Sequence, residues 1–399
     1  MRPGLLSRRG HRLGFRLRRT SPSQEKPEMI DALARIISEV IEPQALVTDL
    51  HGTFPRAAME ALGREGILGL LSAKGVGGSG QGLRAASWVV EQIGAACGST
   101  GMVLCMHYCA TAIIEQHGPW AVRQEIAAGR HITTLAFSEA GSRSHFWAPV
   151  STAAPADGDT VRLDADKSWA TSAGQVDSYV WSSKPLAASG LSTLWLVPGK
   201  APGLSYPRAF DGLGLRGNAS SPIEARNVLI PRSAMLGPDG GGFELMMGIA
   251  LSHFQVLSAS CYLGIMEAAT KKASAHVAAT RFDHLGQSLA SLATIRAYLA
   301  RMRLKTDMVR GLLRDTLDSL EEGREDAQLR VLEVKAAAGE MATEVTELAM
   351  RVCGGAAFRK EVGLERYFRD ARAATVMSPT TDLLYDFIGK AAAGMPLFE

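Results

Sequence analysis

Residues 223–230 read Ile223-Glu-Ala-Arg-Asn-Val-Leu-Ile230, a run in which apolar and polar side chains largely alternate. This period of two is typical of a β-strand with one buried face. Clusters of Pro, Gly, Asp and Ser separate it from other short runs of the same kind, which lie at 133–137, 160–163, 178–182 and 192–197. The sequence therefore predicts a central antiparallel β domain, barrel-like in form, over residues 132–237.

The segment before this β domain has the period of amphipathic helices instead. Apolar residues from Ile30 to Val40 recur on one stripe, and similar spacing continues at 54–71 and 82–94. An N-terminal helical domain is expected over residues 27–131.

After residue 237 the helical period returns over longer stretches. Apolar-periodic segments lie at 243–280, 288–320 and 326–352, and a short last helix is predicted at 381–392. These segments predict a C-terminal four-helix bundle over residues 238–399. The expected fold class is α+β, mostly α.

Length and composition agree with a packed protein of several domains. The chain has 399 residues, of which 46% are hydrophobic and 21% charged, so it can bury a large core and is not a disordered chain. Its five cysteines are too few for a disulfide framework and favour a reducing compartment, so a cytoplasmic location is expected. Uninterrupted apolar runs are too short to span a bilayer, and no membrane partner is expected.

The first 26 residues differ from the rest of the chain. Residues 1–24 hold seven arginines and no acid, and removing them from the net charge of +3 leaves −4 for the body. An acidic body gives no electrostatic footprint for nucleic acid. We expect residues 1–26 to be a disordered extension, with an organelle presequence as the alternative, which would change the location to an organelle matrix.

Two clusters contain residue types that bind anions or metals in other proteins. The small-residue loop at 138–145 follows a strand and includes Ser138 and Ser144, and its backbone N–H groups suit an anion. The cluster Cys105-x-His107-x-Cys109 has a spacing that does not converge on one helix face, so no metal site is expected.

Two further patterns suit a flat, phosphorylated ligand. Trp169 stands beside Thr171 and Ser172, where it can stack on a ring while the hydroxyls bind the ring edge. An ordinary buried tryptophan gives the same local pattern and is favoured when this pattern is taken alone. Arg281, at a helix end, suits a phosphate, although a surface arginine is the commoner case.

Five motifs follow one another along the chain, at Leu135–Ser144, Lys167–Ser172, Gly212–Pro231 with Leu236-Gly237, Gly354-Gly355 and Arg366–Arg372. The first two resemble the Leu-Thr-Glu-Pro…Gly-Ser-Asp loop and the Lys-x-Trp-Ile-Thr-Asn strand of the acyl-CoA dehydrogenase family of flavoproteins. The others resemble its Gly-x-Arg…Val-x-Val-Pro…Leu-Gly passage and its Gly-Gly…Arg-x-x-Arg-Asp-Ala-Arg signature. The resemblance covers residues 27–399.

This resemblance implies one FAD per subunit and a homo-oligomer, a tetramer or a dimer. Trp169 would lie against the flavin ring, Ser138 and Thr171 at its edge, and Arg281 at the FAD phosphates. Gly354, Gly355 and Thr380 would belong to the cofactor-binding surface and partly reach the FAD of a neighbouring subunit. The residues expected to bind the cofactor are Ser138, Ser144, Trp169, Thr171, Ser172, Arg281, Gly354, Gly355 and Thr380.

The resemblance fails at the catalytic base. Most members of the family place a Glu after the Arg-Asp-Ala-Arg signature, and a second group places it on the helix that opens the C-terminal domain. Here Ser378 and Phe254 occupy these two positions. Ser378 keeps a backbone N–H for the oxyanion hole, and Asp382 and His253 are the nearest candidates for a base.

The family implies an FAD-dependent oxidoreductase acting on the CH–CH group of an acyl thioester, linked to CoA or to a carrier protein, with an electron acceptor as a further partner. The missing Glu leaves three alternatives open. These are a flavin-dependent monooxygenase, a desulfinase-type enzyme on the same fold, and a non-catalytic flavin-binding subunit.

Overall fold

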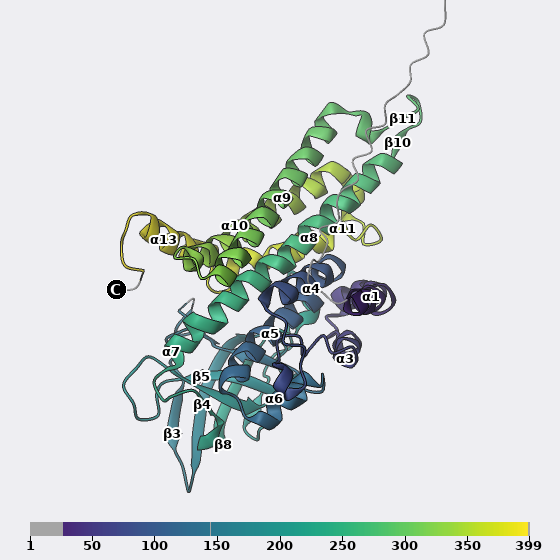
Figure 1. Ribbon diagram of the computed structural model, residues 1–399. Coiled ribbons are helices and arrows are strands. Elements are labelled where there is room, and N and C mark those ends of the chain that lie inside the picture. The colour runs from purple at the N-terminus through teal and green to yellow at the C-terminus, as the bar shows by residue number, and fades with distance from the viewer. Residues whose placement is uncertain (1–26, 144, 398–399) are drawn as a thin grey trace, which may run out of the picture.

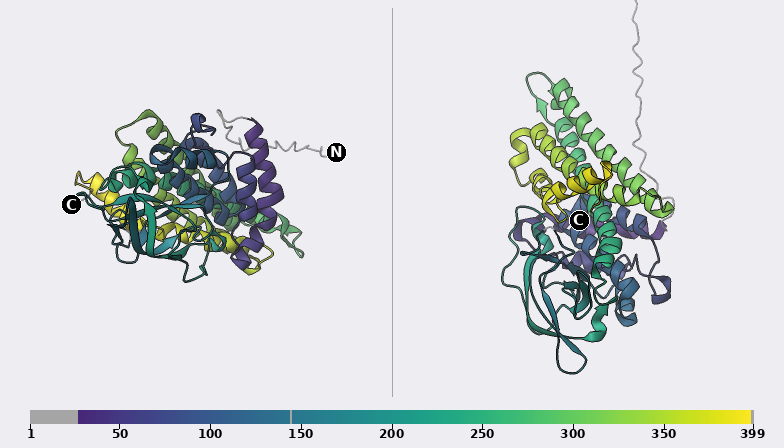
Figure 2. Two further views of the ribbon diagram at one scale, coloured as in Figure 1. Left: turned by 90° about the horizontal axis from the view of Figure 1, so that it is seen from below. Right: turned by 90° about the vertical axis from the view of Figure 1, so that its left-hand side faces the viewer.

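The computed structural model describes residues 27–143 and 145–397, so the prediction for residues 1–26 lies outside the described part of the chain. N-terminal helices, a central β region and a long C-terminal bundle follow one another, as the fold class predicted. The β region and the far tip of the bundle lie at opposite ends of an elongated molecule, with the N-terminal helices beside their junction (Figures 1 and 2).

The N-terminal helices are α1 (Pro27–Ile36), α2 (Glu42–His51), α3 (Arg56–Arg64), α4 (Leu83–Ala96), α5 (Gly98–His117) and α6 (Trp120–Ala127). A π-helical turn at 37–41 joins α1 to α2, so the helical pattern expected from Ile30 to Val40 continues to His51. The predicted helix at 54–71 ends early because Gly66 takes a left-handed conformation with φ of +71°. Just before it, Gly63 packs against a second chain segment, where an added Cβ would lie 2.4 Å from the carbonyl oxygen of Gly129.

The β region consists of two sheets. The first has the order β1 (Thr133–Ala136), β5 (Ser178–Ser183), β6 (Thr193–Pro198) and β9 (Met235–Leu236). The second has the order β2 (Ser138–Glu139), β4 (Thr160–Ala170), β8 (Ser221–Pro231) and β7 (Leu204–Ser205), and β3 (Thr152–Pro155) also pairs with β4.

Two features of this region differ from the prediction. The barrel-like form is wrong, because the two sheets do not close in the described part of the chain and the edge strands β2, β7 and β9 have two residues each. The strands are also not all antiparallel, since β1 and β5 are parallel. The chain leaves β1 for the second sheet and returns along β5, and this long crossover permits a parallel pair.

The C-terminal region begins with α7 (Gly242–Leu245), a π-helical turn at 246–250 and α8 (Leu251–Ala279). A hairpin of β10 (Arg281–Phe282) and β11 (Gln287–Ser288) leads to α9 (Ala293–Glu322) and α10 (Ala327–Cys353). Shorter helices follow, α11 (Leu364–Ala371), α12 (Ala373–Val376) and α13 (Thr381–Ala392), and pack on α10. The three long helices and this shorter group form the bundle that the sequence predicted as four helices.

The helical stretch Gly242–Ala279 is long and apolar enough to cross a membrane, but 89% of its most apolar window is buried inside the fold. It packs against α4, α9 and α10, so it is the core helix that joins the N-terminal helices to the bundle.

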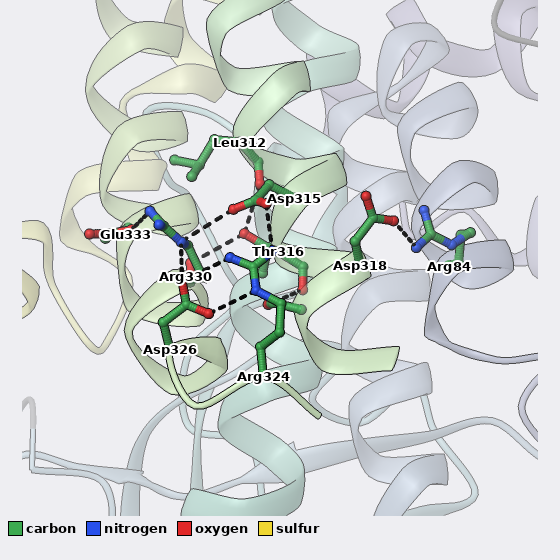
Figure 3. A network of polar contacts seen from close by, with 10 residues as sticks. Arg84, Leu312, Asp315, Thr316, Asp318, Arg324, Asp326, Arg330 and Glu333 are labelled. Carbon is green, nitrogen blue, oxygen red and sulfur yellow. Dashed lines mark hydrogen bonds and ion pairs between the residues drawn. The ribbon is translucent and has the colours of Figure 1, made fainter. Parts of the chain in front are cut away.

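Charged side chains also join these two regions at the surface. Arg84 of α4 donates to Asp318 of α9 at 2.6 Å (Figure 3). It also donates to Glu321 of α9 at 2.7 Å. Nearby, Arg324 and four other charged residues form a network over the turn between α9 and α10, namely Asp315, Asp326, Arg330 and Glu333. The side chains of this network are 25–42% exposed, so water screens its charges in part and each pair contributes little to stability.

Candidate functional site

A cavity of ≈830 Å³ opens between the second sheet and the C-terminal helices. Its β wall comes from β2, the end of β4 and the loop at 210–220, and its helical wall from the start of α8 and the segment 369–379. The cavity brings together five residues singled out from the sequence, namely Ser138, Trp169, Thr171, Phe254 and Ser378.

Trp169 is 61% exposed on the β wall. Along β4 the odd-numbered residues 161–167 are buried, so strict alternation would bury Trp169 as well. The pairing of β4 with β8 shifts register between Lys167 and Ala170, and the indole is turned outward to meet Phe210 edge-on at 6.2 Å. The alternative of an ordinary buried tryptophan is therefore wrong.

Hydroxyl groups follow Trp169 along the same wall. The hydroxyls of Thr171 and Ser220 form a hydrogen bond at 3.1 Å, and Ser138 lies beside them in the cavity lining. Ser172 does not line the cavity. Its backbone has a φ of +63°, and its buried Oγ has no hydrogen-bond partner in the described part of the chain.

A buried ion pair anchors this wall. The ammonium of Lys167 donates to Glu139 Oε1 at 2.6 Å, and the side chains are 0% and 1% exposed. Glu139 also accepts from the backbone N–H groups of Val150 at 2.6 Å and Ser151 at 2.9 Å, and from the Ser151 hydroxyl at 2.6 Å. Burial acts to raise the pKa of Glu139, but Lys167 and these hydrogen bonds outweigh it and hold the pKa below its usual range. The sequence motifs contained both residues, but their pairing was not predicted.

A second anchor holds the loop that closes the cavity. Asp370, which is buried, accepts the backbone N–H of Leu215 at 2.6 Å, and Leu215 has a strained left-handed backbone with φ of +51°. Arg369 donates to the carbonyl of Leu213 at 3.1 Å and forms an ion pair with buried Asp49 of α2. Burial raises the pKa of Asp370 to about 6.

Three domain profiles match the chain, namely the acyl-CoA dehydrogenase N-terminal domain at residues 23–129, the middle domain at 134–228 and the C-terminal domain at 240–393. The mitochondrial short-chain specific acyl-CoA dehydrogenase of Bos taurus is 30% identical over 92% of this chain and 91% of its own length. This chain belongs to the acyl-CoA dehydrogenase family.

Two solved structures that align with this chain over most of its length have the same fold. Butyryl-CoA dehydrogenase from Megasphaera elsdenii aligns with a TM-score of 0.86 at 21% identity, covering 93% of this chain and 99% of that one. The prolyl acyl carrier protein oxidase AnaB aligns with a TM-score of 0.82 at 17% identity, covering 92% and 100%. The fold class predicted from the sequence is therefore confirmed.

FAD is the cofactor of this family, and the β wall fits it. Trp169 lines the cavity with an indole that is 61% exposed and can stack on a planar ring. The hydroxyls of Ser138 and Thr171 border the same space and suit the polar edge of an isoalloxazine ring. Ser172, next along the chain, has a buried Oγ without a hydrogen-bond partner in the described part of the chain.

The helical wall includes the two residues that the resemblance puts at base positions. Ser378 and Phe254 both line the cavity. His253 and Asp382 do not line it. The ring of His253 forms a hydrogen bond from Nδ1 to the carbonyl of Ile249 at 2.8 Å, and burial lowers its pKa. Asp382 is exposed on α13.

Several residues expected at the cofactor lie elsewhere. Thr380 caps α13, where its hydroxyl accepts the N–H of Leu383 at 3.4 Å. Arg281 lies on β10, at the end of the bundle far from the sheets, and donates to the carbonyl of Gly286 at 3.1 Å (Figure 1). Gly354 and Gly355 follow α10 outside the cavity lining. Ser144 lies outside the described residues.

Proposed function

We propose that this family member binds an acyl thioester in the cavity and does not abstract the substrate α-proton with a carboxylate of its own. One observation carries the proposal. Among the described lining residues Glu139 is the only carboxylate, and its oxygens already accept from Lys167, Val150 and Ser151. Proton abstraction by Glu139 would require breaking a buried ion pair, which costs several kcal/mol.

The remaining lining groups suit binding rather than proton transfer. Arg143 and Arg372 border the cavity with charged guanidiniums that suit a phosphate or carboxylate. The apolar side chains of Phe254, Val376 and Met377 provide a dry surface for an acyl chain. FAD, when bound, supplies the acceptor for a hydride from the acyl chain.

The thioester carrier is proposed to be CoA or a carrier protein, since both kinds of substrate appear in the names of structural relatives. A re-oxidising electron acceptor is the second partner. We place the protein in the cytoplasm, as the free cysteines favour.

The decisive experiment is anaerobic mixing of the purified flavoprotein with saturated acyl thioesters while the flavin absorbance is followed. General-base catalysis is worth about 10²–10⁴ in rate, so bleaching should be slower by at least that order than in a member that holds the Glu. Ser378→Glu should accelerate bleaching by a thioester that fits the cavity. Ser378→Gln should not, because glutamine has about the size of glutamate but no carboxylate to act as a base.

Rapid bleaching of the unmodified protein would contradict the proposal. Asp382→Asn and His253→Ala then become the variants that identify the base. If the rapid bleaching survives both, the proton is removed by a group outside those considered.

A second function is favoured by the same observation. A flavin-dependent monooxygenase needs no α-proton base, and the cavity offers no unpaired carboxylate among its described lining residues. Oxygen consumption that depends on both a thioester and an external reductant, without anaerobic bleaching, would support this function over dehydrogenation.

We also propose that the protein is a homo-oligomer in which Arg281, Gly354 and Gly355 serve the flavin of a neighbouring subunit. None of the three lines the cavity of its own chain, and Arg281 lies on β10 at the far tip of the bundle (Figure 1), which supports this proposal. Arg281→Ala should lower FAD retention on desalting, whereas the exposed control Arg35→Ala should not, and a monomer in light scattering would contradict the proposal.

A further inference from the structure

The segment that carries Ser378 rests on one buried lysine. Lys335 of α10 has no solvent exposure, and its ammonium donates to three backbone carbonyls. These are the carbonyls of Met377 at 2.9 Å, of Pro379 at 2.6 Å and of Ala374 at 3.4 Å. All three belong to α12 and the turn that follows it.

This arrangement matches donors to acceptors one to one. An ammonium has three N–H donors and no acceptor, and three carbonyls converge on it. A neutral amine has only two N–H donors and directs its lone pair at the third carbonyl. Loss of the proton therefore removes one hydrogen bond and places a repulsive contact behind the turn.

Lys335 acts from behind the cavity wall. Met377, Ser378 and Pro379 line the cavity, whereas Lys335 does not. Its ammonium also lies 5.8 Å from the ring centre of Phe254, the other residue at a base position. One turn further along α10, Gly339 faces the same segment, and a Cβ there would meet the carbonyl oxygen of Ala374 at 3.4 Å.

A buried ammonium without a carboxylate partner is costly. Its three hydrogen bonds offset that cost only while the carbonyls of Ala374, Met377 and Pro379 converge on it, so the charge and the turn conformation depend on each other. We propose that Lys335 is a positioning residue whose charged ammonium holds the Ser378 turn in the conformation that shapes the thioester end of the cavity.

The charge state of Lys335 is free to change near neutral pH. Burial lowers the pKa of Lys335 to about 7, and no charged neighbour shifts it. The helices packed against α10 carry titratable groups of their own, which include His253, Lys305, Asp370, Asp382 and Tyr385. The turn should therefore be held firmly below pH 7 and loosen above it.

The first experiment measures amide hydrogen exchange of the segment 373–383 in the full-length holoprotein. Lys335→Met keeps the length of the side chain and removes the donors, so exchange should accelerate at least about tenfold, the equivalent of one hydrogen bond to a charged group. Lys305→Met is the matched control, because Lys305 is a lysine of the same bundle that pairs with Glu344 on α10. Unchanged protection in Lys335→Met would overturn the proposal.

The second experiment follows the visible spectrum of the bound flavin between pH 6 and pH 9. The wild-type protein and Lys305→Met should show one transition near pH 7, and Lys335→Arg, which stays charged, should keep the low-pH spectrum throughout. A transition that survives in Lys335→Arg belongs to another group and overturns the proposal. If Lys335→Met fails to fold, the wild-type exchange rates, corrected for intrinsic pH dependence, must still rise above pH 7.

This inference depends on the proposed function only in treating the cavity as the thioester-binding site. If thioesters fail to reduce the flavin, the exchange experiment still tests Lys335. If exchange is unaffected while thioesters behave as proposed, only the role of Lys335 is refuted.

Discussion

Substitutions in the Glu139–Lys167 ion pair test which interactions stabilise the β wall of the cavity. Lys167→Met removes the partner from a carboxylate that is 1% exposed and leaves it three neutral donors, from Val150 and Ser151. Breaking a buried pair from one side costs about 3–5 kcal/mol, because the remaining charge stays desolvated. The loss corresponds to about 4–6 °C in melting temperature if a chain of this length melts as one unit.

The assay is thermal unfolding of the apoprotein and the FAD-loaded protein by circular dichroism. The double variant Glu139→Gln with Lys167→Met removes both charges and should recover more than half of the loss, since a neutral pair has no buried charge to desolvate. Arg35→Met, which breaks an exposed pair with Glu65, should leave the melting temperature unchanged. A loss below about 1 kcal/mol for Lys167→Met, or a double variant no more stable than it, would refute the reasoning.

Three further outcomes are expected. Trp169→Ala should lower FAD retention on desalting without lowering the stability of the apoprotein, since the indole is 61% exposed. Because the pKa of Asp370 is raised from 3.8 to about 6, its contribution to the free energy of unfolding falls as pH rises through this window; Asp370→Asn should abolish that slope in urea titrations. Asp49→Asn should speed amide exchange in the loop at 212–216, because Arg369 loses the carboxylate that orients it.

Much of the fold could be predicted because the chain changes its apolar period at the domain borders. The last helix, Thr381–Ala392, has the predicted bounds, and the predicted strands overlap β1, β5, β6 and β8 apart from their ends. The run predicted at 160–163 is only the start of β4, which continues to Ala170. The helix predicted at 54–71 was too long, because apolar residues continue past Arg64 into a glycine turn that buries them without helical geometry. The spacing of apolar residues along the chain gives no sign that the backbone of Gly63 packs closely against Gly129.

The site could be predicted only where residue type decides the chemistry. Ser378 and Phe254 both line the cavity, and their assignment to the two base positions stays a prediction from the motifs. The outward turn of Trp169 could not be deduced, because it depends on a register shift against β8. The role of Lys335 was missed as well. Within an apolar helical stretch one lysine suggests a solvated face, and only the fold shows three carbonyls gathered around it.

Separate interactions stabilise the two walls of the cavity. Residues on the helical wall can therefore change without altering the β wall that fits the cofactor. Glu139 and Lys167 anchor the β wall from inside the sheet region. Lys335 supports the Ser378 turn from inside the bundle. No hydrogen bond or ion pair joins one anchor to the other in the described part of the chain, so energies of changes at the two anchors should be close to additive. A chain can therefore replace the base residue on the helical wall without losing the surface that fits the flavin, and measuring Lys167→Met and Lys335→Met singly and together would reveal any coupling.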